Sequence, residues 1–361
     1  MILAFVMMDV SFIFPVKTKK QTQTENIVIV TLDGMRWQEL FGGAEHALML
    51  NKKFTKDSAG INEKFWKEDI DERRKELFPF IWSVIAKEGQ IYGNRAYAND
   101  VDNANPYKYS YPGYNEIFTG YPDPAVNSND KILNKNTNVL EFINKQPGYE
   151  GKVAAFTTWD VFPFILNQKR SGIYINADTD SLKFGSKNFS ILNDMQFLAA
   201  EPIGVRPDII TYLAAKEYFK EYRPKVLFIG FDETDDFAHN GMYDQYLKSA
   251  HAEDGMIADL WNTIQLDPQY KNKTTLIITC DHGRGDGNKP SGNWCEHGDD
   301  VADAGQIWIA AIGPDTKPLG EVKTPSVLYQ KQLAATFASL LGFHFTAEHP
   351  VAAPIERVYK K

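Results

Sequence analysis

TLIITCDHG, residues 275–283, carries the clearest structural signal in the chain. An apolar run rich in β-branched residues stops abruptly at an acid, an imidazole and a glycine. The stretch IVIVTLDG at residues 27–34 has the same form and ends in Asp33 and Gly34. Such runs, without polar alternation, are typical of strands buried on both faces of a mainly parallel sheet. The same pattern predicts strands at Val153–Thr157, Val226–Phe231 and Ile307–Ile312.

Helical patterns lie between these runs. They cover Leu77–Lys87, Asn138–Asn144, Pro207–Glu221, Tyr243–Ile264 and Ser326–Leu341, and Gly342 follows where a C-cap glycine belongs. Alternating strands and helices predict an α/β fold, a three-layer α/β/α sandwich with a mainly parallel central sheet. We expect a single domain over residues 26–361, with irregular rim insertions near residues 44–74 and 166–200.

The composition narrows the function classes. The chain has 361 residues, and 39 basic against 47 acidic side chains give a formal net charge of −8. This balance argues against a nucleic-acid partner, which would need a basic face. Two cysteines cannot build a disulfide scaffold, although Cys280 and Cys295 could pair in an exported protein; the alternative is two small buried residues.

Residues 1–25 resemble an export signal followed by a polar linker. Met1–Val16 is mostly apolar, but Asp9 interrupts it, and it is shorter than the about 20 residues of a membrane-spanning helix. It also lacks the initial positive charge and the cleavage motif of a secretory signal. We expect a periplasmic or secreted protein without a stable transmembrane span.

Acidic and histidine side chains gather after the predicted strands. They are Asp33, Asp235, His239, Asp281, His282 and His297. Each alone also fits an ordinary turn, helix start or surface histidine, but their coincidence indicates a site. Ligands of open α/β sheets bind beyond the carboxyl ends of the strands, so we expect these side chains to converge. Carboxylates with imidazoles suit two borderline divalent ions, zinc above all.

A metal site of this kind needs a nucleophile, and Ser110 is the candidate. It stands in the segment KYSYPGYNEIF, residues 108–118, directly before a short predicted helix. Serine is a good N-cap, so capping alone also explains it. A helix N-terminus favours an alkoxide and a bound phosphoryl group, and a nearby zinc ion would lower the pKa of the serine hydroxyl.

Together these motifs resemble the alkaline phosphatase superfamily, in particular its nucleotide pyrophosphatase/phosphodiesterase branch. That family has an Asp after the first strand, a Thr or Ser in a T-F-P-N-like turn, then D-x-x-x-H, D-H-G and a late H-G. Here the same order is met by Asp33, Ser110, Asp235 to His239, 281–283 and 297–298. The resemblance spans residues 26 to about 342, which is most of the chain.

The resemblance implies two Zn²⁺ ions, other divalent ions being possible. One would be held by Asp235, His239 and His297, and the other by Asp33, Asp281 and His282, with Ser110 also touching it. It further implies in-line attack of Ser110 on the phosphorus of a small-molecule phosphate ester. A phosphoserine intermediate would form, and water activated at the first ion would release phosphate.

Substrate-binding residues are less well defined. Family members bind a phosphoryl oxygen with an Asn downstream of the nucleophile, and Asn129 is the nearest candidate, with Asn127 and Asn115 as rivals. A monoesterase also needs cationic clamps. Lys169 and Arg170 are the first candidates for this role, and Arg36 and Arg284 are further ones.

A diesterase would instead need an apolar pocket, which Trp37, Phe41, Tyr111 and Trp159 could form, and the residues leave this choice open. The superfamily also contains sulfatases and phosphoglycerate mutases, and the chain could be similar to either. Tyr114 stands where a sulfatase motif requires Arg, and 361 residues leave no room for the inserted domain of the mutase. A non-catalytic binding module would lack a ligand or the nucleophile, and none is missing. The oligomeric state stays open.

Overall fold

A sheet of apolar strands forms the centre of the molecule. The computed structural model describes residues 22–183, 187–201, 203–287 and 293–360. Within them the main sheet has eight strands, in the order β10 (Gly320–Glu321), β2 (Gln90–Tyr92), β9 (Ile309–Ile312), β7 (Thr274–Thr279), β1 (Asn26–Leu32), β6 (Val226–Phe231), β4 (Val153–Thr157) and β5 (Tyr174–Ala177). The five strands from β7 to β5 are parallel, whereas β9 runs against both of its neighbours.

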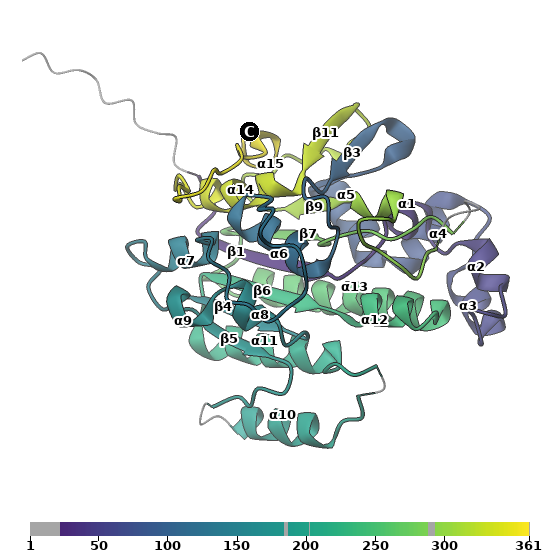
Figure 1. Cartoon of the computed structure of the whole chain (residues 1–361), viewed down its shortest axis with the longest axis horizontal. Coiled ribbons are helices and arrows are strands. Elements are labelled where there is room, and N and C mark those ends of the chain that lie inside the picture. Colours follow the sequence, from purple (N-terminus) through teal and green to yellow (C-terminus); the bar gives the residue numbers. More distant parts are fainter. Residues whose placement is uncertain (1–21, 184–186, 202, 288–292, 361) are drawn as a thin grey trace, which may run out of the picture.

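Helices cover both faces of this sheet (Figure 1). On one face lie α6 (Ser110–Thr119), α7 (Val139–Asn144), α8 (Phe162–Ile165) and α14 (Leu333–Leu340), with α15 (Glu356–Tyr359) packed on α14. On the other lie α11 (Asp208–Tyr222), α12 (Glu233–His239) and α13 (Tyr243–Leu266), with α10 (Lys187–Leu198) outside α11. The predicted three-layer α/β/α sandwich is confirmed.

Shorter elements surround the sandwich. They are α1 (Trp37–Gly42), α2 (His46–Leu50), α3 (Ser58–Phe65), α4 (Ile70–Leu77), the π-helical turn η1 (Ile81–Ile85), α5 (Ala86–Glu88), α9 (Gln168–Ser171), and the 3₁₀ turns η2 (Arg95–Tyr97), η3 (Ala302–Gly305) and η4 (Gln330–Gln332). A small sheet joins β11 (Ser326–Tyr329), β3 (Asn99–Asp102) and β8 (Gln306–Ile307). Among the described residues, no helix combines the length and apolar character needed to cross a bilayer.

Two predicted elements are divided in the structure. The predicted helix Ser326–Leu341 begins as strand β11, because residues 326–329 pair with β3, and only its second part is α14. The predicted strand Ile307–Ile312 is divided at Trp308: Ile307 belongs to the small sheet, and β9 belongs to the main sheet. Both differences arise from pairing between residues distant in sequence.

The predicted helix Leu77–Lys87 is also interrupted. It consists of the end of α4, a break at Phe78 directly before Pro79, and then η1 with α5. Proline has no backbone N–H for the helical ladder, and it disfavours helical dihedrals in the residue before it.

The two predicted irregular insertions are more regular than expected. Residues 44–74 contain α2, α3 and most of α4, which pack against α13. Residues 166–200 contain α9, the edge strand β5 and α10. Their polar sequences hide these elements because each is short or half exposed. The predicted signal-like segment and linker cover residues 1–25, of which residues 1–21 lie outside the described residues. In the described part, the backbone N–H groups of Gln23 and Thr24 donate to the Asp315 carboxylate.

The backbone of helix α6 packs directly against the backbone of the loop that follows β7. Gly113 lies so close to the loop after β7 that an added Cβ would stand 2.5 Å from the carbonyl oxygen of Asp281. Pro112 precedes this glycine in the first turn of the helix, which proline tolerates because the N–H groups there have no helical partner.

We expect Gly113→Ala to lower the free energy of unfolding by about 1–3 kcal/mol, because the new methyl group has no space. Gly255→Ala is the matched control: this glycine is exposed in α13 with no atom near the added Cβ, so it should gain about 0.5–1 kcal/mol. Urea denaturation of both variants measures the difference. Equal stability of the two would contradict the close packing of α6.

Candidate metal centre and nucleophile

The carboxyl ends of β1, β6 and β7 meet at one edge of the sheet. The register pairs Leu32 with Phe231 and Thr31 with Thr279, so the three strands end almost level. Asp33 follows β1 directly, Asp281 follows β7 after one residue, and α12 likewise begins one residue after β6. This arrangement brings polar side chains from distant parts of the chain to one place, as expected for an open α/β sheet.

Helix α12 is anchored to α11 and to the end of β1. The Asp208 carboxylate accepts the backbone N–H groups of Asp232 and Glu233, which satisfies the first turn of the helix. The Thr234 hydroxyl donates to the carbonyl oxygen of Asp33 at 2.7 Å. Asp235 and His239 stand one helical turn apart and therefore share a face, with His239 Nε2 3.1 Å from Asp235 Oδ2.

Asp33, Asp281 and His282 form a fully buried group, here called the inner trio. One possible ligand atom from each lies within 4.8 Å of the others. His282 Nε2 stands 3.4 Å from both Asp33 Oδ1 and Asp281 Oδ2, and neither of these oxygens has a hydrogen-bond partner. Two buried carboxylate oxygens thus lie near the same ring nitrogen without a donor to satisfy them.

Asp235, His239 and His297 form a second group, here called the outer trio, with ligand atoms again within 4.8 Å. His239 and His297 bring their Nε2 atoms to 3.0 Å from each other. Asp235 is buried and His239 is exposed, so this group opens towards solvent. The rings of His282 and His297 stack at 3.8 Å between centroids, which joins the two trios.

Hydrogen bonds fix the tautomers of two histidines. His282 Nδ1 lies 2.9 Å from the carbonyl oxygen of Gly283, and His297 Nδ1 lies 2.8 Å from that of Lys108. A ring nitrogen facing a carbonyl must donate, so Nε2 of each neutral ring carries the lone pair. Burial lowers the pKa of His282 well below its usual value and that of His297 to about 4, which keeps both rings neutral. This is the state of a metal-ligating histidine.

The carboxylates of the inner trio are electrostatically unfavourable without a cation. Burial, followed by repulsion from Asp281 and Asp235, raises the pKa of Asp33 well above its usual value. Burial and the Asp235 charge raise the pKa of Asp281 to about 8. Unpartnered oxygens, neutral imidazoles and repelling carboxylates together fit a divalent cation, whose charge would reverse these shifts.

Ser110 stands beside the inner trio. Its Oγ lies 3.2 Å from His282 Nε2, and its side chain is buried. The N-cap of α6 is Tyr109 rather than Ser110, which is the first residue of the helix. The predicted capping role is therefore wrong by one position, and the hydroxyl faces the trio instead of closing the helix.

Asn129 lies close to this nucleophile candidate. Its Oδ1 accepts the backbone N–H of Tyr111 at 2.9 Å, one residue after Ser110. Of the two rivals, Asn115 binds the carbonyl oxygen of Tyr121 and the amide of Asn134, inside the fold. The structure thus brings Asn129 next to the start of α6.

Of the four side chains predicted as cationic clamps, three are bound by acidic side chains of the protein, and the fourth, Lys169, is exposed. Arg284 pairs with Asp235 and donates to the carbonyl oxygens of Trp294 and Cys295. Arg36 pairs with Glu39 and Glu45 and donates to the carbonyl oxygen of Gly285. Arg170 binds Glu141 and three backbone carbonyls, and Lys169 is exposed beside it on α9.

Arg284 has an effect on the outer trio that the sequence did not predict. Burial acts to raise the pKa of Asp235, but the charge of Arg284 and the hydrogen bond from His239 lower it well below the usual value. Asp235 is thus held ionised by a cation of the protein itself. The two cysteines do not pair: Cys280 and Cys295 are both free and buried.

Tyr114 and Gln330 are site residues that sequence reasoning missed. The Tyr114 hydroxyl donates to Asp33 Oδ2 at 2.9 Å, and Gln330 Nε2 donates to the carbonyl oxygens of Cys280 and Asp281. The spacing of Ser110 and Tyr114, one helical turn, was the available signal for the tyrosine. Gln330 had none, because it reaches the site from η4.

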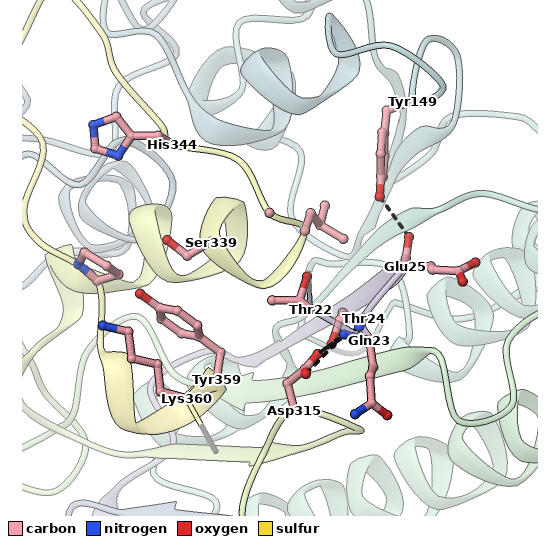
Figure 2. Close-up of a pocket in the computed structure, with 13 residues that line it drawn as sticks. Thr22, Gln23, Thr24, Glu25, Tyr149, Asp315, Ser339, His344, Tyr359 and Lys360 are labelled. Atoms are coloured by element: carbon pink, nitrogen blue, oxygen red, sulfur yellow. Dashed lines mark hydrogen bonds between the residues drawn. The ribbon is translucent and has the colours of Figure 1, made fainter. Parts of the chain in front are cut away.

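The edge opposite the trios holds a cavity of about 1230 Å³ (Figure 2). It lies beside the start of β1, where Tyr149 binds the carbonyl oxygen of Glu25 and Asp315 binds Gln23 and Thr24. Parallel strands begin at this edge, whereas the trios lie where they end. The cavity is therefore separate from the candidate site.

Comparisons with known proteins agree with this geometry. A family model described as "Type I phosphodiesterase / nucleotide pyrophosphatase" matches residues 47–333. The chain belongs to this family. As a type I phosphodiesterase / nucleotide pyrophosphatase family protein, it is a phosphoric-ester hydrolase, and members of the family depend on metal ions. No curated protein sequence matches the chain.

Solved structures of the alkaline phosphatase superfamily share the fold of this family member. The alkaline phosphatase PafA matches with a TM-score of 0.60 at 12% identity, over 94% of this chain and 99% of that one. Murine ectonucleotide pyrophosphatase/phosphodiesterase 5, in complex with AMP, matches with a TM-score of 0.56 at 13% sequence identity. The match covers 91% of this chain and 97% of the murine one. A 2-O GAG sulfatase matches with a TM-score of 0.56 at 12% sequence identity, over 93% of this chain and 74% of the sulfatase. At such identities the likeness concerns the fold alone.

The inner trio predicts a pH-dependent effect of metal on stability. Without metal, Asp281 keeps its proton up to about pH 8, whereas in the unfolded chain it loses the proton near its usual pKa of 3.8. The folded state then binds more protons, so metal-free protein loses stability as pH rises through this window. A bound divalent cation would replace the proton, so the melting-temperature gap between metal-loaded and metal-free protein should widen from about pH 5 to about pH 8.

Scanning calorimetry at several pH values measures this gap. Asp315→Asn is the control, because this buried acid lies at the opposite edge of the sheet and should leave the widening unchanged. A gap that stays constant or narrows with rising pH would contradict the electrostatic description of the inner trio.

Proposed function

We propose that this chain is a two-zinc phosphoric-ester hydrolase that acts through a phosphoserine intermediate on Ser110. The observation that carries the proposal is the position of the Ser110 hydroxyl, 3.2 Å from His282 Nε2 at the inner trio. A buried hydroxyl at a helix N-terminus and beside a cation site is a suitable nucleophile towards phosphorus.

The ligand assignment follows the two trios. Asp33, Asp281 and His282, with Ser110, would hold one zinc ion, and Asp235, His239 and His297 the other. Mixed carboxylate and imidazole donors suit zinc better than calcium, which prefers oxygen ligands alone. When bound, the two ions would lower the pKa of the serine hydroxyl and neutralise charge on the phosphoryl oxygens.

The proposed chemical step uses Ser110 as the nucleophile and Asn129 as a donor to the phosphoryl group. Ser110 Oγ would form a bond to phosphorus while the bond to the leaving oxygen breaks, and the hydroxyl proton would pass, directly or through solvent, to that oxygen, which departs as an alcohol. Water then cleaves the phosphoserine, which returns the free hydroxyl and releases the phosphoryl product. The Nδ2 group of Asn129 is suited to donate to a phosphoryl oxygen, because Oδ1 of the same amide already accepts the Tyr111 N–H. The positive end of the α6 helix dipole would also stabilise the negative charge of that phosphoryl oxygen.

The cationic side chains favour a diester over a monoester. A monoester carries a second negative charge that needs a further cation. Arg36, Arg170 and Arg284 are each held by acidic side chains of the protein itself. Among the described residues, these arginines therefore offer no free clamp, which supports phosphodiesters or pyrophosphates as substrates.

The N-terminal residues support export. Met1–Val16 is apolar enough for the central part of a signal segment. We therefore place the mature protein in the periplasm or outside the cell, acting on a small-molecule phosphoric ester.

Replacing Ser110 by Ala should lower turnover at least about 1000-fold, because the covalent route is lost. Zinc content should stay at the wild-type level, since both trios are intact. Ser171→Ala is the matched control, a buried serine in α9 whose loss should leave turnover unchanged. Steady-state assays with elemental analysis measure both quantities. Wild-type turnover in Ser110→Ala would refute the phosphoserine mechanism.

A side-by-side assay with an aryl phosphodiester, an aryl phosphate and an aryl sulfate tests the substrate class. We expect kcat/KM to be at least about 10-fold higher for the diester than for the monoester, because Arg36, Arg170 and Arg284 are held by acidic side chains and do not neutralise the second charge. The sulfate should be the slowest. Highest activity on the sulfate would favour a sulfatase, and highest activity on the monoester would contradict the clamp argument.

A further inference from the structure

Helix α6 contacts every member of the inner trio. Ser110 Oγ lies 3.2 Å from His282 Nε2, and Gly113 lies against the backbone of Asp281. Tyr114 reaches Asp33 Oδ2 at 2.9 Å. These three helix residues stand within about one turn, so their side chains and backbone form one rigid surface against the trio. The position of this helix is therefore linked to the positions of all three candidate ligands.

The direction of the Tyr114 hydrogen bond is defined by its surroundings. The Thr31 hydroxyl donates to the phenol oxygen at 3.3 Å, so the phenol proton is left for Asp33. The ring is fully buried and packs edge-on against Phe162, 4.5 Å away between centroids, and Phe228, 6.5 Å away.

This bond distinguishes the two oxygens of Asp33. Oδ2 accepts the phenol proton, whereas Oδ1 is buried, has no hydrogen-bond partner and faces His282 Nε2 at 3.4 Å. Oδ1 is therefore the oxygen of Asp33 that has no partner and is free to face a cation. Hydrogen bonds of this kind orient ligands and tune metal affinity, and losing one typically costs about 10- to 100-fold.

We propose that Tyr114 is a positioning residue that holds Asp33 with Oδ1 towards the inner metal site and thereby links that site to the helix of the nucleophile. Because this inference rests on the proposed two-zinc function, its test must separate the two. Tyr114 of α6 would then orient the ligand Asp33, and Ser110, one helical turn earlier, would attack phosphorus. Loss of the phenol hydroxyl should make the positions of both Asp33 and Ser110 less well defined.

Tyr114→Phe removes the hydroxyl and keeps the ring in its aromatic contacts. We expect its zinc affinity, measured by chelator competition on the metal-free full chain, to fall about 10- to 100-fold for one of two ions. The absorption spectrum of the Co²⁺-loaded variant should also change, because Asp33 is free to rotate. Tyr270→Phe is the matched control: it removes another buried hydroxyl, bound to the carbonyl oxygen of Pro224, and should change neither.

Affinity and spectrum of Tyr114→Phe equal to those of Tyr270→Phe would overturn the inference and leave the proposed function intact. Intact zinc binding without hydrolysis of any phosphoric ester would refute the function and leave the positioning role. A wild-type chain that binds no zinc would overturn both. A crystal structure of the zinc-loaded wild type tests the inference without a variant: Asp33 should bind through Oδ1 alone, and binding through Oδ2 or through both oxygens would overturn it.

Discussion

Repulsion among buried carboxylates is the constraint on which the carboxyl edge of this sheet depends. Asp33, Asp281 and Asp235 are all buried, and the charges of Asp281 and Asp235 raise the pKa of Asp33. Neutral histidines add lone pairs rather than positive charge to the same space. A fold that places these groups together gains nothing from them unless cations join, so the energetic cost of the arrangement is explained by a metal-dependent function.

Two neighbouring side chains reduce the electrostatic cost of burying these carboxylates. Arg284 gives Asp235 a permanent positive partner, which keeps one carboxylate ionised and leaves Oδ2 beside His239. Tyr114 gives Asp33 a neutral donor, which satisfies one oxygen and leaves the other unpartnered. One charged and one neutral neighbour thus each occupy one oxygen of a candidate ligand, and the other oxygen lies beside a histidine of the same trio.

Much of this edge could be predicted from the sequence, because the carboxyl ends of parallel strands must meet. The apolar runs before Asp33, Asp235 and Asp281 indicated the direction in which these side chains would lie, and the structure brings together the same two trios. What the side chains hold remains a prediction. Residues 326–329 could not be recognised as a strand, because their pairing with β3 depends on residues more than 200 positions away.

Further features were hidden for different physical reasons. Tyr114 looks like any core aromatic, since only its hydroxyl takes part in the site. Arg284 looks like a substrate clamp, since sequence cannot show that Asp235 already occupies it. In both cases the hydrogen-bond partner decides the role, and that partner is known only in three dimensions.

Anomalous diffraction at the zinc edge from crystals of the zinc-loaded protein is the most direct test of the paired-cation site. We expect two zinc peaks per chain, one in contact with Asp33, Asp281, His282 and Ser110, and one in contact with Asp235, His239 and His297. A single peak, or peaks away from these side chains, would contradict the two-zinc site.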